Sequence, residues 1–225
     1  VLSPAASASE SVASGFGMGV AGAVSGAGEV ANNVILSKTN AYIDNSNVHS
    51  KVDFNLDAEN KSTIIATVAA LSVALGGGGT VGAGVSIGAS TSRNYIGYDQ
   101  EGNQQPAEVM AYVRDSSIKA SGDVSLDALA NEKIDAVVLA GSAAIAGGGV
   151  VGIAASGAGV AAINRLGTHA TAFIDGDGAD GISAKPVTLS ATATSRIDAL
   201  VGPASIALLV AVAVPASSSS ALPLA

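Results

Sequence analysis

The chain has 225 residues and a formal net charge of −8, and it is 48% hydrophobic but only 3% aromatic. Its ten Lys and Arg residues are scattered along the sequence, which argues against nucleic acid and anionic lipid as partners. Because the chain has no cysteine, disulfides, thiolate catalysis and cysteine-based metal sites are excluded.

The first predicted elements are strands of three kinds. A Gly-rich apolar strand is predicted over residues 15–25, a short strand over 41–44 (AYID) and an alternating strand over 52–58. The alternating strand places its apolar residues on one face and its polar residues on the other: Val52, Phe54, Leu56 and Ala58 against Asp53, Asn55 and Asp57. Period-two alternation of this length indicates a half-buried strand.

The next element, residues 80–89, has one bulky apolar face and one face with almost no side chains. The two faces are Val81, Ala83, Val85 and Ile87 against Gly82, Gly84, Ser86 and Gly88. We expect the bulky faces to point inward and form a Val/Ile/Leu/Ala core. The Gly-rich face would then lie outside, where another part of the chain or a neighbouring molecule must cover it.

Two later runs, 134–163 and 197–214, are also apolar and long enough for helices that span a bilayer. A soluble or interfacial helix is a further alternative. Glycines at 76–79 and 147–149, together with Pro203, disfavour both kinds of helix. The period-two pattern favours strands, and we expect no membrane insertion.

A repeat connects these elements. Three similar segments, at 41–58, 111–128 and 172–191, are each followed by a polar connector, an Ile and an Ala/Gly/Val run. The anchors are aromatic (Tyr42, Tyr112 and Phe173, with spacings of 70 and 61) and aliphatic (Ile64, Ile134 and Ile197, with spacings of 70 and 63). The longest polar connector, 98–108, occurs in one copy only and is predicted to be a loop insertion that causes most of this difference.

We interpret the chain as one repeat-built domain, 1–225. Its divisions are a partial unit 1–63, a unit 64–133, a unit 134–196 and a partial unit 197–225. The chain begins inside one apolar unit and ends after the opening of another, so we expect a fragment of a longer array.

The predicted fold is all-β, a parallel β-helix (β-solenoid) built from degenerate repeats of about 60–70 residues. Three strand types in each unit suggest three coils of about 22 residues. Stacking them at about 4.8 Å would give a rod of roughly 40–50 Å.

The series AYID, GDVSLDA, IDAV and GGG followed by VG resembles the repeat of very large secreted bacterial surface proteins, the filamentous-haemagglutinin-like adhesins and leukotoxin-type exoproteins. The similarity covers essentially the whole chain. It implies a parallel β-helical stalk, secretion to the cell surface and a role in attachment or scaffolding, with no catalytic residues to transfer. The sequence departs from the pattern in the 98–108 insertion and at Lys185–Pro186, where Pro186 must stand at a strand start.

The sharpest chemical motif is DGDGADG at 175–181. Asp175, Asp177 and Asp180 could converge on one cation, and oxygen ligands suit calcium. The alternative, which we favour, is an ordinary Asp/Gly turn. The other two copies lack these carboxylates. We therefore predict no cofactor, with calcium at Asp175, Asp177 and Asp180 as the one alternative.

Few other residues suggest chemistry. His49 and His169 occupy different places in their units and are interpreted as surface or turn residues. The segment GGGGTVGAG lacks the Lys–Ser/Thr ending of a phosphate-binding loop. Tyr95 and Tyr98, beside the 98–108 loop, are the only candidate binding patch, with loop packing as the alternative.

The predicted function is therefore structural and non-catalytic. We expect a rigid stalk or extracellular filament of a secreted bacterial surface protein that associates with itself, with other surface proteins or with glycans through strand stacking and Gly/Ala-rich faces. Alternatives are a module that binds glycan, ice or another surface through a row of Thr188, Thr192 and Thr194, a polysaccharide-active enzyme, and a membrane-inserted segment.

Overall fold

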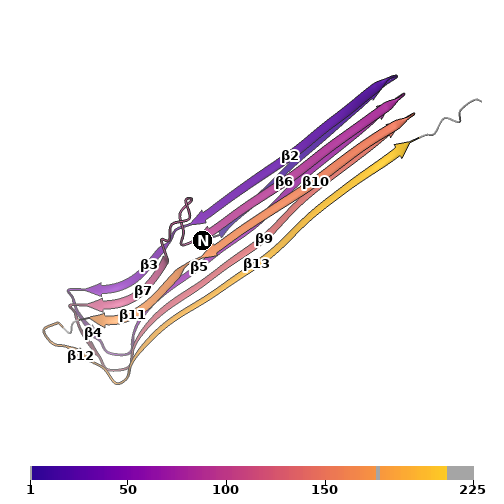
Figure 1. Ribbon diagram of the computed structural model, residues 1–225. Coiled ribbons are helices and arrows are strands. Elements are labelled where there is room, and N and C mark those ends of the chain that lie inside the picture. The colour runs from indigo at the N-terminus through magenta and orange to yellow at the C-terminus, as the bar shows by residue number, and fades with distance from the viewer. Residues whose placement is uncertain (1, 176–177, 212–225) are drawn as a thin grey trace, which may run out of the picture.

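The computed structural model describes residues 2–175 and 178–211. These residues form thirteen strands and no helix. The strands are β1 (Leu2–Gly17), β2 (Val20–Ile35), β3 (Lys38–Asp44), β4 (Asn47–Ser50), β5 (Phe54–Gly78), β6 (Val81–Ile96), β7 (Ala107–Arg114), β8 (Ser117–Ala120), β9 (Val124–Gly148), β10 (Val151–Leu166), β11 (Thr168–Asp175), β12 (Ile182–Ser183) and β13 (Val187–Ala211). The chain is therefore all-β, as predicted, and the helical alternatives are wrong for the described part of 134–163 and 197–214 (Figure 1).

The strands form four stacked sheets in which every strand pairing is parallel. We call β1-β5-β9-β13 the long sheet and β2-β6-β10 the facing sheet. The two end sheets are β3-β7-β11 and β4-β8-β12. The chain passes once through all four sheets before it returns to the first, so each predicted repeat is one such pass.

The predicted anchors lie side by side in the sheets. Ile64 pairs with Ile134, which pairs with Ile197. Tyr42 and Tyr112 stack with ring centroids 5.3 Å apart, and Phe173 continues the stack at 5.0 Å. The residues that the sequence repeat aligns are thus paired with one another on neighbouring strands.

The prediction of three coils of about 22 residues in each unit is wrong. The alternating polar segment and the apolar run that follows it form one uninterrupted 25-residue strand, as in β5 and β9, so a whole unit is needed for one pass. A strand of that length extends about 80 Å, whereas four stacked strands span only about 15 Å. The expected 40–50 Å rod along the stacking direction is wrong for the same reason.

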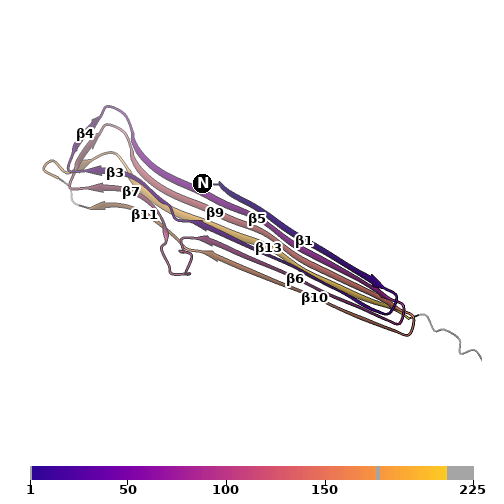
Figure 2. The same ribbon diagram turned by 90° about the horizontal axis from the view of Figure 1, so that it is seen from above.

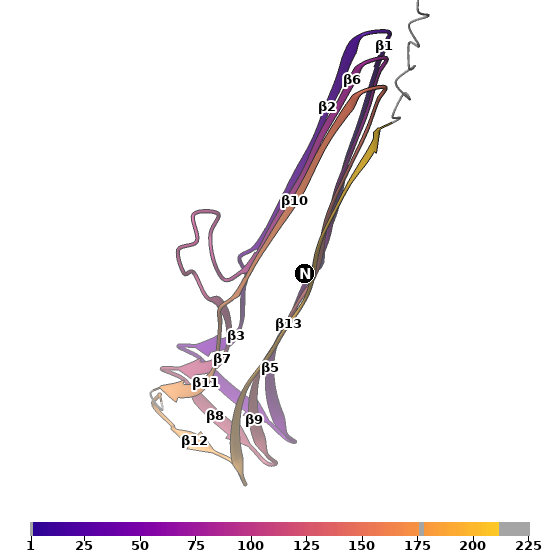
Figure 3. The same ribbon diagram turned by 45° about the vertical axis from the view of Figure 1, so that its right-hand side comes forward.

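The long strands divide the molecule into an arm and a base. The arm consists of β1, β2, β6 and β10 with the second halves of β5, β9 and β13, from residues 64, 134 and 197. The base holds their first halves and the end sheets. Figure 3 shows the two layers of the arm running close together and separating at the base. At the arm tip the chain turns at residues 18–19, 79–80 and 149–150. The predicted strand 15–25 is therefore wrong as one element, because Met18 and Gly19 divide it between β1 and β2.

The base has an apolar core of the expected kind. Ile118, Leu126 and Val113 are fully buried in it with their neighbours from β7, β8 and β9. A second cluster around Ile64, Ile96 and Ile134 lies where the base meets the arm.

The arm is reversed relative to the prediction, because its Gly-rich face points inward. Gly82, Gly84 and Gly88 of β6 are buried, while the neighbouring Ile87 is 59% exposed. A Cβ on Gly82 would stand 2.0 Å from the carbonyl oxygen of Gly147 in the long sheet. Toward the tip the two sheets therefore approach backbone to backbone, and the bulky side chains lie outside, whereas nearer the base Val68 and Val138 are still buried between the sheets. The cover expected for the Gly-rich face is the opposite sheet of the same chain.

The predicted loop insertion is confirmed. Residues 97–106 separate β6 from β7, whereas two residues separate β2 from β3 and one separates β10 from β11. The offset between paired residues is accordingly 61 from β2 to β6 and 70 from β6 to β10. Pro186 directly precedes β13, as predicted, and its carbonyl accepts a hydrogen bond from the Val124 N–H at 3.0 Å.

Candidate functional site

The outer faces of the arm expose many large hydrophobic side chains. On the long sheet, Leu71, Leu139 and Ile145 point outward and are exposed. On the facing sheet, Val24, Ile87 and Ile153 do the same. Figure 2 shows the two layers that carry these faces extending side by side from the base. Apolar patches of this extent mark interaction surfaces in soluble proteins.

The tip of the arm is apolar as well. Phe16, Met18 and Val20 surround the first turn and are 77%, 93% and 77% exposed, and Val150 at the third turn is 69% exposed. Turns at the surface are ordinarily polar, so the apolar character of the outer faces continues around the end of the arm.

Small polar side chains hold the interior of the arm together. Three serine pairs join the two sheets, one for each repeat: Ser11 with Ser25 at 3.0 Å, Ser72 with Ser86 at 2.7 Å, and Ser142 with Ser156 at 2.6 Å. Each pair satisfies hydroxyls that would otherwise be buried without partners. Every buried side-chain nitrogen and oxygen in the described ranges has a hydrogen-bond partner.

An asparagine ladder lies near the base of the arm. The Asn33 amide donates to Asn94 Oδ1 at 2.7 Å, and the Asn94 amide donates to Asn164 Oδ1 at 2.8 Å. Sequence reasoning missed this ladder, although residues 33, 94 and 164 show the same spacings of 61 and 70 as the strand pairing.

Glu132 is the one fully buried carboxyl group among the described residues. Thr168 Oγ1 donates to its Oε2 at 2.8 Å, and Asn60 Nδ2 approaches its Oε1 at 3.5 Å. Burial raises the pKa of Glu132, and the Thr168 hydrogen bond partly offsets that effect. The group lies between strands rather than in a cleft, which fits a structural role.

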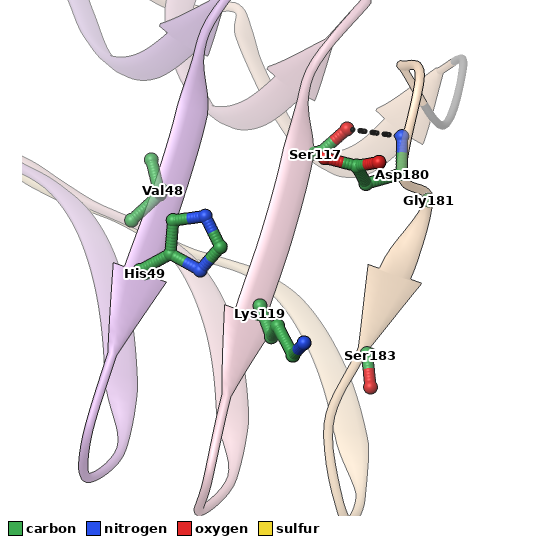
Figure 4. Close-up of a pocket in the computed structure, with 7 residues that line it drawn as sticks. All are labelled: Val48, His49, Ser117, Lys119, Asp180, Gly181 and Ser183. Atoms are coloured by element: carbon green, nitrogen blue, oxygen red, sulfur yellow. Dashed lines mark hydrogen bonds between the residues drawn. The ribbon is translucent and has the colours of Figure 1, made fainter.

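A shallow polar hollow of about 390 Å³ lies on the outside of the end sheet β4-β8-β12 (Figure 4). His49, Lys119 and Ser183 occupy equivalent positions on its three strands. The Asp180 N–H donates to Ser117 Oγ at 2.9 Å at its rim. His49 and Lys119 are exposed, and the buried Ser117 of the lining is already hydrogen-bonded to the Asp180 N–H.

Of the three predicted calcium ligands, the structure describes Asp175 and Asp180. Asp177 lies outside the described residues. Asp175 and Asp180 are exposed, and Asp175 is in register with Arg114, a cation that would repel a metal. Within residues 2–175 and 178–211 no group of three or more His, Cys, Asp or Glu side chains could hold a metal ion. Calcium binding therefore stays a prediction.

Arg114 itself pairs with the carboxylate on its other side. Its Nη2 and Nε donate to Asp44 of the neighbouring repeat at 2.6 and 3.2 Å. This hydrogen bonding lowers the pKa of Asp44. The pair is exposed. It helps to fix the register of β3 against β7 and does not form a reactive site.

Tyr95 and Tyr98 pack the inserted loop and do not form an open patch. Tyr95 is buried, and the Arg165 guanidinium lies 5.6 Å from its ring centroid and 5.8 Å from that of Tyr98. Arg165 also donates to the Gly102 carbonyl at 3.0 Å. The alternative of loop packing is thus confirmed for Tyr95.

The remaining sequence candidates lie apart. His169 is exposed in β11, far along the chain from His49 in β4. Thr188, Thr192 and Thr194 are exposed along β13, where the paired residues of β9 are Ser125, Leu129 and Asn131, so the Thr row is not repeated on the neighbouring strand.

Comparison with known proteins finds no matching family model, no similar curated protein and no similar solved structure. The described part of the chain holds no helix long and apolar enough to cross a membrane. The candidate site is accordingly defined by this chain's geometry alone: the two apolar faces of the arm and the open edges of its sheets.

Proposed function

We propose that this chain is a non-catalytic structural segment of a secreted bacterial surface protein, and that its passes form a parallel β-helix that stacks into a rigid stalk or extracellular filament. The sequence resemblance to adhesin repeats supports the class of protein. The arm and base geometry supports the mechanical role, because successive repeats superimpose strand on strand.

The observation that carries this proposal is the exposure of inward-facing residues on β13, the edge strand of the long sheet. Ile64 and Ile134 are fully buried, yet Ile197, which pairs with Ile134 on the same inward row, is 45% exposed. Val187 and Leu189 on the same strand are also exposed by more than 40%. Another β strand placed beside β13 would cover these residues and satisfy the backbone groups of its free edge.

A second copy of this chain can supply that strand. The opposite edge of the long sheet is β1, which pairs with β5 on one side only. In the register that β1 adopts on β5, β1 of one copy would cover Ile197 and the arm half of β13 in another, and it would continue the parallel order with a strand spacing of about 4.8 Å. Val187 and Leu189 lie beyond the start of β1 and would stay uncovered in this contact. Association of this kind is end to end and produces a filament.

Sedimentation of the purified chain over a wide range of concentrations tests the proposal. We expect assemblies that lengthen with concentration, with a 4.8 Å reflection along the filament axis in fibre diffraction. Ile197→Lys should shorten them, because the ammonium group would be buried between copies. Thr194→Lys is the matched control, since Thr194 points outward from the same strand and the change should leave assembly as in the wild type.

Assembly of Ile197→Lys to the same length as the wild type would contradict stacking through this edge. A wild-type chain that stays monomeric at the highest concentrations would contradict the filament.

A further inference from the structure

The outer face of the long sheet in the arm carries almost no charge. In β5 no charged residue follows Lys61, in β9 none follows Asp135, and in β13 none follows Asp198 up to Ala211. In the described part of β1 the only charge is Glu10, on the edge strand. At the junction of base and arm the same sheet still carries ion pairs such as Lys133 with Asp135 at 2.7 Å. The face changes from solvated to apolar at the junction of base and arm.

This face is indented as well as apolar. A hollow of about 250 Å³ lies over Gly141, bordered by Leu71, Val73, Ala204 and Ile206 and, on the edge strand, by Glu10. Leu71 leans over Gly141, so that a Cβ there would stand 2.6 Å from its Cδ2. A hollow of this size and lining accepts an aliphatic side chain.

The facing sheet carries side chains of the complementary shape. Ile87 is in register with Gly26 on one side and Gly157 on the other. No heavy atom lies within 4 Å of a Cβ built on Gly157, so the glycine leaves open space beside the exposed Ile87. The arm therefore presents an indented face on one side and protruding aliphatic side chains on the other.

We propose that the apolar outer face of the long sheet in the arm binds the arm of a second copy of this chain, sheet face against sheet face. About 14 residues on each of four strands cover a plane of about 46 by 19 Å, or close to 900 Å². Stable protein–protein interfaces bury about 800 Å² on each partner. One arm face is thus large enough for a specific contact, at the spacing of about 10 Å found between packed sheets.

The open sheet edges favour a second copy over a lipid bilayer. β1 and β13 each pair with one neighbour only, and their unpaired N–H and C=O groups would have no partners in hydrocarbon. Packing of two arms face to face leaves these edges in water or joined to the next repeat. Because the two faces of the arm differ in shape, a contact between unlike faces does not close and can continue laterally.

This inference extends the proposed function. It rests on that proposal in one respect, namely that the partner is a second copy of the same chain. End-to-end stacking uses the strand edges, whereas the lateral contact uses the arm faces. The Ile197→Lys background, in which end-to-end stacking is blocked, therefore separates the two.

In that background we expect sedimentation to detect dimers or larger species that are lost on adding Leu139→Lys, because the charge would be buried in the contact. Adding Asn55→Lys should leave them intact, since Asn55 points outward from the same sheet but in the base. Circular dichroism of both variants checks that the strands persist. A 10-fold or greater rise in the dissociation constant for Leu139→Lys alone supports the proposal.

Two results would overturn it. The first is an Ile197→Lys chain that is monomeric at all concentrations, which would leave the end-to-end filament standing without its lateral contact. The second is a monomer that cosediments with phosphatidylcholine vesicles and loses this binding with Leu139→Lys, which would make lipid the occupant of the face.

Discussion

Gly82 of β6 faces Gly147 of β9 so closely that a Cβ added to Gly82 would lie 2.0 Å from the Gly147 carbonyl oxygen. The same closeness recurs nearer the base, where a Cβ on Gly88 would lie 2.4 Å from the Gly141 carbonyl oxygen. Two β layers can approach this far only where side chains are absent or very small. The Gly, Ala and Ser content of the chain therefore reflects the interior of a thin arm, and toward the tip the large aliphatic residues, among them Ile87 and Ile145, lie outside it.

The asparagine ladder gives a first prediction. Asn94→Ala removes the acceptor of the Asn33 amide and the donor to Asn164 Oδ1, both of which lie in the arm interior. We expect the free energy of unfolding to fall by about 2–4 kcal/mol, since each buried polar group left without a partner costs about 1–3 kcal/mol. Urea unfolding followed by circular dichroism measures this.

The end of the same ladder provides the control. Asn164→Ala breaks one of these hydrogen bonds and lies on β10, the edge strand of the facing sheet. Its cost should be about half that of Asn94→Ala. Equal losses for the two variants would show that the ladder does not act as a connected row.

Glu132 gives a prediction for pH. Burial raises its pKa in the folded chain, so the folded state binds the proton more tightly than the unfolded state does. The stability linked to this group is fully present below the unfolded pKa, near 4.3, and is lost as pH rises through the folded pKa. Glu132→Gln should therefore be more stable than the wild type at pH 7, by an amount on the order of 1 kcal/mol, and the difference should shrink toward pH 4.

Thermal unfolding of both chains from pH 4 to pH 8 measures this difference directly. Comparison at each pH cancels the effects of the other carboxyl groups, among them Asp99, whose pKa is lowered chiefly by the Asn103 side chain. Glu101→Gln, in the exposed loop, is the control and should follow the wild type. A Glu132→Gln chain that loses stability at pH 7 would mean that the buried carboxylate is favourable as an anion.

Pro203 gives a prediction for the sheet edge. Because the Val124 N–H donates to the Pro186 carbonyl, even-numbered residues of β13 bond to β9 and odd-numbered residues face the free edge. Pro203 therefore removes one donor from that edge, which is where proline is tolerated in sheets. Pro203→Ala should restore the donor and strengthen end-to-end association by about 2- to 10-fold, as one added hydrogen bond of about 0.5–1.5 kcal/mol implies.

The association constant from sedimentation is the measurement for this variant. Pro186→Ala is its control, because an N–H at position 186 would face β9 rather than the free edge, and no gain is expected. Weaker association of Pro203→Ala would show that β13 does not join another copy through its free edge.

Particular residues show how far the sequence could predict the fold. Tyr42, Tyr112 and Phe173 revealed the repeat, and the alternation of residues 52–58 identified half-buried strands. Both features can be recognised from short segments of the sequence. The coil size could not be read, because nothing at Thr63 marks whether β5 ends or continues into its apolar run. The strand continues, because residues Phe54 to Gly78 pair with β9 without interruption.

The prediction of which face of the arm strands lies inside was wrong for a related physical reason. A strand with Val81, Val85 and Ile87 on one face ordinarily buries that face, and this default holds unless the opposing sheet is too near. The distance between the sheets is a tertiary property that residues 80–89 do not encode by themselves. The inner serine pairs would have been a signal, because Ser11, Ser72 and Ser142 recur with the spacings of the repeat.

The stability of Gly82→Ala tests the central claim most directly, namely that the Gly-rich face of the arm lies inside. We predict a loss of about 1–3 kcal/mol or more in the free energy of unfolding, because the added methyl group would overpack the contact with the Gly147 carbonyl. Gly159→Ala, on the outer face of β10 with no heavy atom within 4 Å of the added Cβ, should leave stability unchanged or raise it by about 0.4–1 kcal/mol. A Gly82→Ala chain as stable as Gly159→Ala would contradict the claim and place the Gly-rich face outside.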